Sequence, residues 1–152
     1  MFRAILLSAL LATACFAQSQ PNFSGTWKLN VSKSDFGMMP APDSRTDVIE
    51  HAGDTLKDQV AANGQQGKQE YLLTFKTDGT ETVNKIADRE VKVSAKWDGP
   101  AMVVTTKLDF QGTEILIKSN WTLSSDGATL TQAAHIASPM GEMDQKAIFE
   151  KQ

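Results

Sequence analysis

Short segments in which apolar and polar residues alternate recur along this chain, and many of them end in a turn signal. In the segment from 89 to 97, four apolar residues stand two apart: Val91, Val93, Ala95 and Trp97. Side chains of a β-strand point alternately to its two faces, so each such segment predicts a strand with one buried face. Asp-Gly pairs, which favour tight hairpin turns, occur at 78–79, 98–99 and 126–127. The pattern therefore predicts consecutive antiparallel hairpins.

The segments give roughly nine or ten predicted strands. They fall near 23–31, 45–51, 55–62, 68–76, 80–87, 89–97, 101–110, 113–123, 128–137 and 143–150. An open meander of this size would leave two unpaired edges and an uncovered apolar face, and closure removes both problems. We therefore predict an all-β, antiparallel up-and-down β-barrel. The alternative is a two-sheet sandwich, whose crossovers need longer connections than most of those seen here.

The first residues have the pattern of a secretory signal peptide. One positive charge precedes an apolar run from Ala4 to about Leu11, and small residues lead to Ala17. We expect residues 1–17 to be removed and residues 18–152 to form one exported domain, periplasmic or secreted. The alternative is a lipid anchor on Cys15, although Ala12 stands where lipoprotein signals usually carry a large aliphatic residue.

Composition excludes several partners. The chain carries 15 basic and 18 acidic residues without a basic cluster, which argues against nucleic acid and anionic membrane surfaces. After the leader, no apolar run is long enough to span a bilayer. We expect no cofactor, because the sequence holds no phosphate-binding loop, zinc signature or nucleophile elbow.

The predicted first strand begins Phe-Ser-Gly-Thr-Trp-Lys-Leu, at residues 23–29. This motif resembles the start of the calycins, the superfamily of lipocalins and fatty-acid-binding proteins, and residues 147–151 resemble the last strand of the latter. The whole chain after the leader resembles small exported bacterial lipocalin-like proteins. The resemblance implies a barrel that binds a small molecule. It also implies structural roles for Gly25, Trp27 and Phe149, with Trp27 across the closed end of the barrel.

The chain departs from the fatty-acid-binding pattern in two places. Pro40 and Pro42 disfavour the two lid helices that should follow the first strand. Ala147 and Phe149 stand where those proteins commonly use an Arg-x-Tyr to hold a carboxylate. Neither side chain can neutralise an anion, so we expect a small apolar, neutral ligand.

The segment from 33 to 45 is expected to be an irregular loop that carries large apolar side chains. It is either a flap that touches ligand or a plug that closes the barrel end. If the barrel is filled, the alternative function is an envelope interaction or inhibitor module that contacts a protein partner through this loop. Together, loop and strands give these candidate ligand-binding residues: Phe36, Met38, Met39, Tyr71, Phe75, Val93, Trp97, Ile115, Ile117 and Trp121.

Catalysis and metal binding are not predicted. His51 and His135 are the two histidines, and we expect both to lie uncoordinated on the surface. Asp43, Asp47 and Glu50 are expected on a solvated strand face. No acid–base or nucleophilic set converges in the sequence, so we predict a protein that is not an enzyme, with no catalytic residues.

Overall fold

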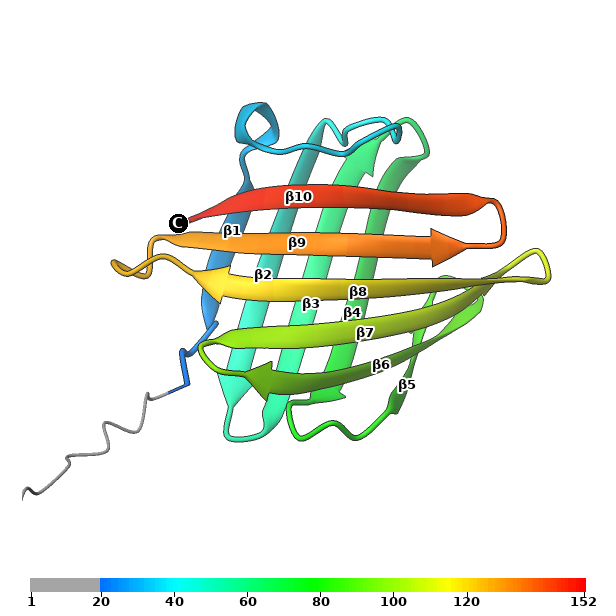
Figure 1. The fold of residues 1–152 in the computed structure, drawn as a ribbon. Coiled ribbons are helices and arrows are strands. Elements are labelled where there is room, and N and C mark those ends of the chain that lie inside the picture. The colour runs from blue at the N-terminus through cyan, green and yellow to red at the C-terminus, as the bar shows by residue number, and fades with distance from the viewer. Residues whose placement is uncertain (1–19) are drawn as a thin grey trace, which may run out of the picture.

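The computed structural model describes residues 20–152, which form ten antiparallel strands in a nearly closed barrel (Figure 1). The strands are β1 Gly25–Leu29, β2 Ser44–Ala52, β3 Thr55–Gly64, β4 Gly67–Lys76, β5 Thr82–Ile86, β6 Arg89–Asp98, β7 Ala101–Phe110, β8 Thr113–Leu123, β9 Thr129–Ser138 and β10 Gly141–Lys151. The predicted signal peptide, its cleavage site and Cys15 lie outside the described residues. Within the described range, no helix is both long and apolar enough to cross a membrane.

The barrel closes through its first strand. The order in the sheet is β4-β3-β2-β1-β10-β9-β8-β7-β6-β5, so β1 lies between β2 and the last strand. Trp27 is in register with Lys151 of β10 and with Asp47 of β2. One continuous ladder through ten strands confirms the predicted up-and-down barrel, and the sandwich alternative is wrong.

The remaining gap lies between β4 and β5, which form no ladder. Side chains span it instead. The Thr74 amide donates to Asn84 Oδ1 at 2.7 Å, and the Thr82 hydroxyl lies 3.0 Å from the Thr74 carbonyl oxygen. These contacts hold the two edges together where backbone pairing stops.

The connection after β1 contains no lid helices. A single 3₁₀ turn, η1 (Val31–Lys33), is capped by Asn30, whose side chain accepts from the Lys33 amide. The chain then runs irregularly to β2. This agrees with the expectation drawn from Pro40 and Pro42.

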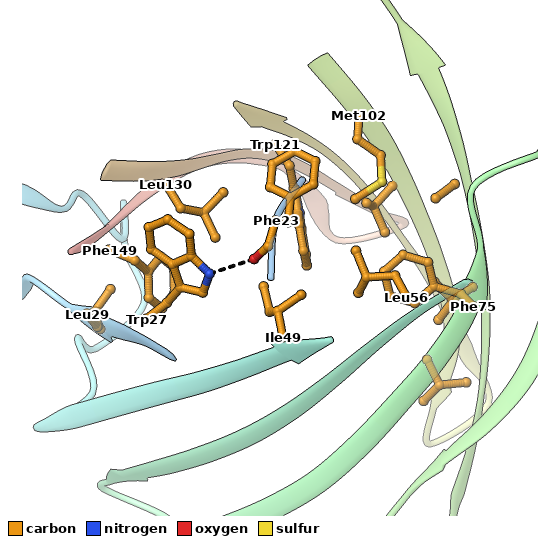
Figure 2. Packing of buried hydrophobic residues seen from close by; sticks show 14 residues of the cluster. Phe23, Trp27, Leu29, Ile49, Leu56, Phe75, Met102, Trp121, Leu130 and Phe149 are labelled. Carbon is orange, nitrogen blue, oxygen red and sulfur yellow. Dashed lines mark hydrogen bonds between the residues drawn. The ribbon is translucent and has the colours of Figure 1, made fainter. Parts of the chain in front are cut away.

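A packed apolar cluster fills one part of the barrel (Figure 2). Trp27 is fully buried there among Leu29, Leu130 and Phe149. Its indole Nε1 donates to the carbonyl oxygen of Phe23 at 2.8 Å. Phe23 precedes β1 and is itself fully buried, so this bond fixes the entering chain against the inside of the barrel.

Gly25 begins β1 with a φ of +147°, a conformation that L side chains rarely adopt. A Cβ at this position would lie 2.7 Å from Cε of Lys151. The Lys151 ammonium lies 5.3 Å from the centre of the Trp27 ring. Gly25 therefore leaves room for the lysine stem that covers the tryptophan.

Trp27→Ala should lower the free energy of unfolding by roughly 3–5 kcal/mol, because it removes a fully buried large aromatic and leaves a cavity. Chemical denaturation followed by circular dichroism measures the change. Val83→Ala is the control: Val83 is 61% exposed and its truncation should cost about 0.5 kcal/mol or less. Equal effects of the two substitutions would contradict a structural role for Trp27.

Candidate functional site

The barrel interior holds a cavity of about 250 Å³ next to the apolar cluster. Phe75, Val104 and Trp121 belong to both, and the two aromatic side chains form its floor, with ring centroids 6.2 Å apart in an edge-to-face arrangement. Phe36, Leu73, Ile86, Leu108, Ile117 and Ile136 extend the apolar lining. Two small side chains, Ala134 and Ala147, also line it, and their size helps leave the space open.

An ion pair lies at the wall of this cavity. Arg45 Nε and Nη2 donate to the two carboxylate oxygens of Asp47, both at 2.7 Å. Asp47 is fully buried, and the guanidinium carbon of Arg45 lies 5.2 Å from the Phe149 ring centre. The bidentate geometry occupies both Asp47 oxygens and commits the charge of Arg45 to this partner.

A second buried carboxyl, Asp58 of β3, also lines the cavity. Burial and the neighbouring Asp47 raise the pKa of Asp58 to about 8, although Arg45 opposes the shift. Burial likewise raises the pKa of Tyr71, whose ring lines the same wall. Near neutral pH, Asp58 is therefore largely protonated and carries a hydroxyl proton.

Two buried polar atoms of the cavity lining have no hydrogen-bond partner among the described residues: Asp58 Oδ1 and Gln132 Nε2. Gln132 lies on β9, in register with Trp121 of β8 and Ala147 of β10. Most buried polar groups in proteins are paired, so two unpaired atoms in one cavity indicate a place for an outside group.

The segment of residues 34–43, called the mouth loop below, runs along one end of the barrel (Figure 1). Asp35 forms a two-way backbone bridge to Lys146 of β10, with N···O distances of 2.8 and 2.7 Å. At its other end, the Asp43 amide donates to the Asn63 carbonyl of β3 at 2.8 Å. Phe36 lies between these anchors and lines the cavity, so the loop covers it at this end.

The structure brings together half of the candidate ligand-binding residues. Phe36, Tyr71, Phe75, Ile117 and Trp121 line the cavity. Three others do not line it: Val93 lies inside the apolar cluster, Trp97 packs against it, and Ile115 of β8 is in register with Leu108 of β7. Met38 and Met39, expected at the mouth, lie on the mouth loop, with Met38 88% exposed and Met39 in a surface groove beside the β3–β4 hairpin. A ligand-binding role for these five residues stays a prediction.

His51 is not the surface residue that the sequence suggested. Its ring stacks on Phe23 and on Trp97, with centroids 6.0 Å apart in each case, and partial burial lowers its pKa. Phe23 also stacks on Trp97 at 5.8 Å. Trp97 and His51 therefore pack around Phe23 at the barrel end where the chain enters.

His135 lies on the outer surface, as expected, but it is paired. Its Nδ1 is 2.8 Å from an Asp144 carboxylate oxygen, and this hydrogen bond raises its pKa. Glu142 lies 3.6 Å from the other ring nitrogen. No group of three metal-ligating side chains with metal-site geometry occurs in residues 20–152.

Arg45, Asp47, Asp58 and Gln132 were missed as interior residues. The expectation that Asp47 faces solvent is wrong, because its side chain is fully buried. A signal was present: Arg45, Asp47 and Ile49 stand two apart, as do Leu56, Asp58 and Val60. In both runs the polar residues share the buried face of their strand.

Asp58→Asn should change how stability depends on pH. The unfolded chain releases the Asp58 proton near pH 4, whereas the folded protein keeps it until about pH 8. Between these values the folded state binds more protons, so this carboxyl stabilises the fold at low pH and its contribution is lost as pH rises. The difference in free energy of unfolding between the variant and the unchanged protein should therefore shift in favour of the variant by on the order of a few kcal/mol from pH 4 to 8. Denaturation at several pH values measures this, and parallel curves would contradict it.

Comparison with known proteins shows the fold. No protein-family model matches the chain, and no curated protein matches it in sequence. Secretory abundant heat soluble protein 4 from Ramazzottius varieornatus aligns with a TM-score of 0.60 at 16% identity, over 86% of this chain and 94% of its own. A point mutant of the fluorescent protein UnaG gives 0.59 at 20%, over 86% and 96%. A Schistosoma mansoni fatty acid binding protein gives 0.53 at 17%, over 86% and 96%. The fold of this chain is therefore the calycin-type β-barrel that its first strand resembles.

Proposed function

We propose that this chain is an exported carrier that holds one small, mainly apolar, neutral molecule inside its barrel. The observation that carries the proposal is the interior cavity with an aromatic floor and two polar atoms without partners. At about 250 Å³ it is slightly smaller than the roughly 300 Å³ at which ligand pockets commonly begin, so the ligand should be small. The Schistosoma mansoni protein of the same fold was solved in complex with arachidonic acid, which supports a binding role for such a barrel.

The charges of the cavity support a neutral ligand, for a reason different from the one drawn from the sequence. That expectation took the interior to lack a cation, which is wrong, because Arg45 lines the cavity. However, Asp47 already neutralises Arg45 through two hydrogen bonds. A carboxylate ligand would therefore lose its hydration without gaining an unpaired cation in return.

The role proposed is binding, not catalysis. The ion pair beside the cavity is satisfied internally, and the lining is mostly aliphatic and aromatic. The raised pKa of Asp58 follows from burial and Asp47. Such an environment holds an apolar molecule and hydrogen-bonds one polar group of it, which is the usual composition of a ligand site.

A neutral ester should bind at least as tightly as the matching acid at pH 7. We expect methyl 4-phenylbutanoate to quench Trp121 fluorescence at concentrations equal to or below those needed for 4-phenylbutanoate. Trp121→Phe is the control, because it removes the fluorophore at the cavity floor and leaves Trp27 and Trp97 elsewhere.

Binding of the acid tenfold tighter than the ester, about 1.4 kcal/mol, would contradict a neutral ligand. Failure of both compounds, and of other apolar probes, to quench fluorescence or shift the melting temperature would contradict the carrier function. That second outcome would favour the alternative of a protein-interaction module, for which the exposed Met38 of the mouth loop is the contact to examine.

Export is proposed from the leader sequence. Intact mass spectrometry of protein recovered from the medium or periplasm of a secreting bacterial host should give a chain that begins near Gln18 or Ser19. A diacylglyceryl adduct on Cys15 would establish the lipid-anchored alternative, and an unprocessed chain in the cytoplasm would contradict export.

A further inference from the structure

We propose that Asp58 and Gln132 together bind the polar end of the ligand, and that this end is an uncharged hydrogen-bond acceptor such as a ketone or ester carbonyl. The inference rests on the proposed carrier function and adds the chemical class of the ligand. It concerns the two lining residues whose polar atoms are left without partners in the described chain.

Both side chains belong to the cavity wall and are held by their strands. Asp58 lies between Ile49 of β2 and Leu73 of β4 in the ladder and is 1% exposed. Gln132 is 8% exposed on β9, beside Trp121. Apolar neighbours flank each of them, so neither can recover its lost hydration by a small movement toward the surface.

The unpaired polar groups of Asp58 and Gln132 favour a ligand group that accepts hydrogen bonds over one that donates them. Gln132 Nε2 is an amide nitrogen and can only donate. Asp58 in its protonated form adds a hydroxyl donor, and burial beside Asp47 favours that form. A carbonyl oxygen has two lone pairs, and one such oxygen can accept from either group or from both.

The other charged and titratable groups near Asp58 do not change the preference for a neutral hydrogen-bond acceptor. Arg45 and Asp47 of β2 use each other, at 2.7 Å in both contacts. Tyr71 of β4 keeps its phenolic proton, since burial raises its pKa. A cationic amine would need Asp58 to lose its proton, and a carboxylate would find no unpaired cation in the lining, so both charged classes bear a cost that a neutral carbonyl avoids.

Four compounds of one shape separate these classes. Butylbenzene, 4-phenyl-2-butanone, 4-phenylbutylamine and 4-phenylbutanoate share a phenyl ring and a short chain and differ in the polar end. Calorimetric titration of the intact protein at pH 7, in two buffers with different ionisation heats, gives both affinity and any proton released. We expect the ketone to bind about tenfold more tightly than butylbenzene, with no proton release.

Substitutions then locate the contact. Gln132→Leu should remove most of the ketone's advantage over butylbenzene, and Asp58→Leu should do the same, whereas Asp58→Asn keeps a donor and should retain it. Gln59→Leu is the matched control: Gln59 adjoins Asp58 on β3 but faces outward, where its amide donates to the Tyr71 carbonyl oxygen. Thermal melting without ligand shows whether each variant is folded, and butylbenzene affinity shows whether its cavity persists.

The outcomes distinguish this inference from the carrier function itself. If none of the four compounds binds the unchanged protein, the carrier function fails. If butylbenzene binds as tightly as the ketone, or if Gln132→Leu and Asp58→Leu leave the ketone's advantage intact, the carrier function stands and the polar contact is overturned. Tightest binding by the amine with release of one proton, lost in Asp58→Asn, would assign a cationic ligand and also overturn the acceptor class.

Discussion

The hydrogen bond from the Trp27 indole to the Phe23 carbonyl is the contact on which the barrel depends. β1 has five residues, yet it is the strand that joins β2 to β10 and so closes the ladder. So short a strand forms few backbone hydrogen bonds, and the burial of Trp27 and of the preceding Phe23 adds to the contacts that hold it in place. A buried carbonyl needs a donor, and the indole supplies it without breaking the sheet. The ladders of β1 close the barrel, and this hydrogen bond holds both β1 and the residue that precedes it against the interior.

The barrel interior has a part filled by the apolar cluster and a hollow part next to it. The cluster around Trp27 packs Leu29, Leu130 and Phe149, while small Ala134 and Ala147 on β9 and β10 leave space next to it. Phe75, Val104 and Trp121 belong to both parts and lie where they meet. The packed part supplies the apolar burial that stabilises a barrel of this size, so the hollow part can keep polar side chains whose burial is costly.

The fold could be read from the sequence because alternation and Asp-Gly turns act locally, and each strand was predicted within a few residues of its bounds. The site could be read only in part. Tyr71, Phe75, Ile117 and Trp121 were found because their apolar character marks the inner face. Asp47 and Asp58 were missed because a carboxylate in an alternating strand is assumed to face water. Arg45 pairs with Asp47 within the same strand, and only the closed barrel shows that this pair and Asp58 lie on the buried face.

The mouth loop shows how a barrel without lid helices can enclose a molecule. Its ends are fixed, at Asp35 by two backbone hydrogen bonds to Lys146 and at Asp43 by one to Asn63. Between them, Phe36 is held by the Gln145 amide, which donates to its carbonyl oxygen at 3.2 Å. A carrier that loads at this end has to move Phe36 without releasing the two anchors. The anchors are backbone hydrogen bonds to strands, whereas Phe36 is bonded to the barrel through the Gln145 side chain and to the loop itself through the Met39 amide. The middle of the loop is therefore the part that costs least to move.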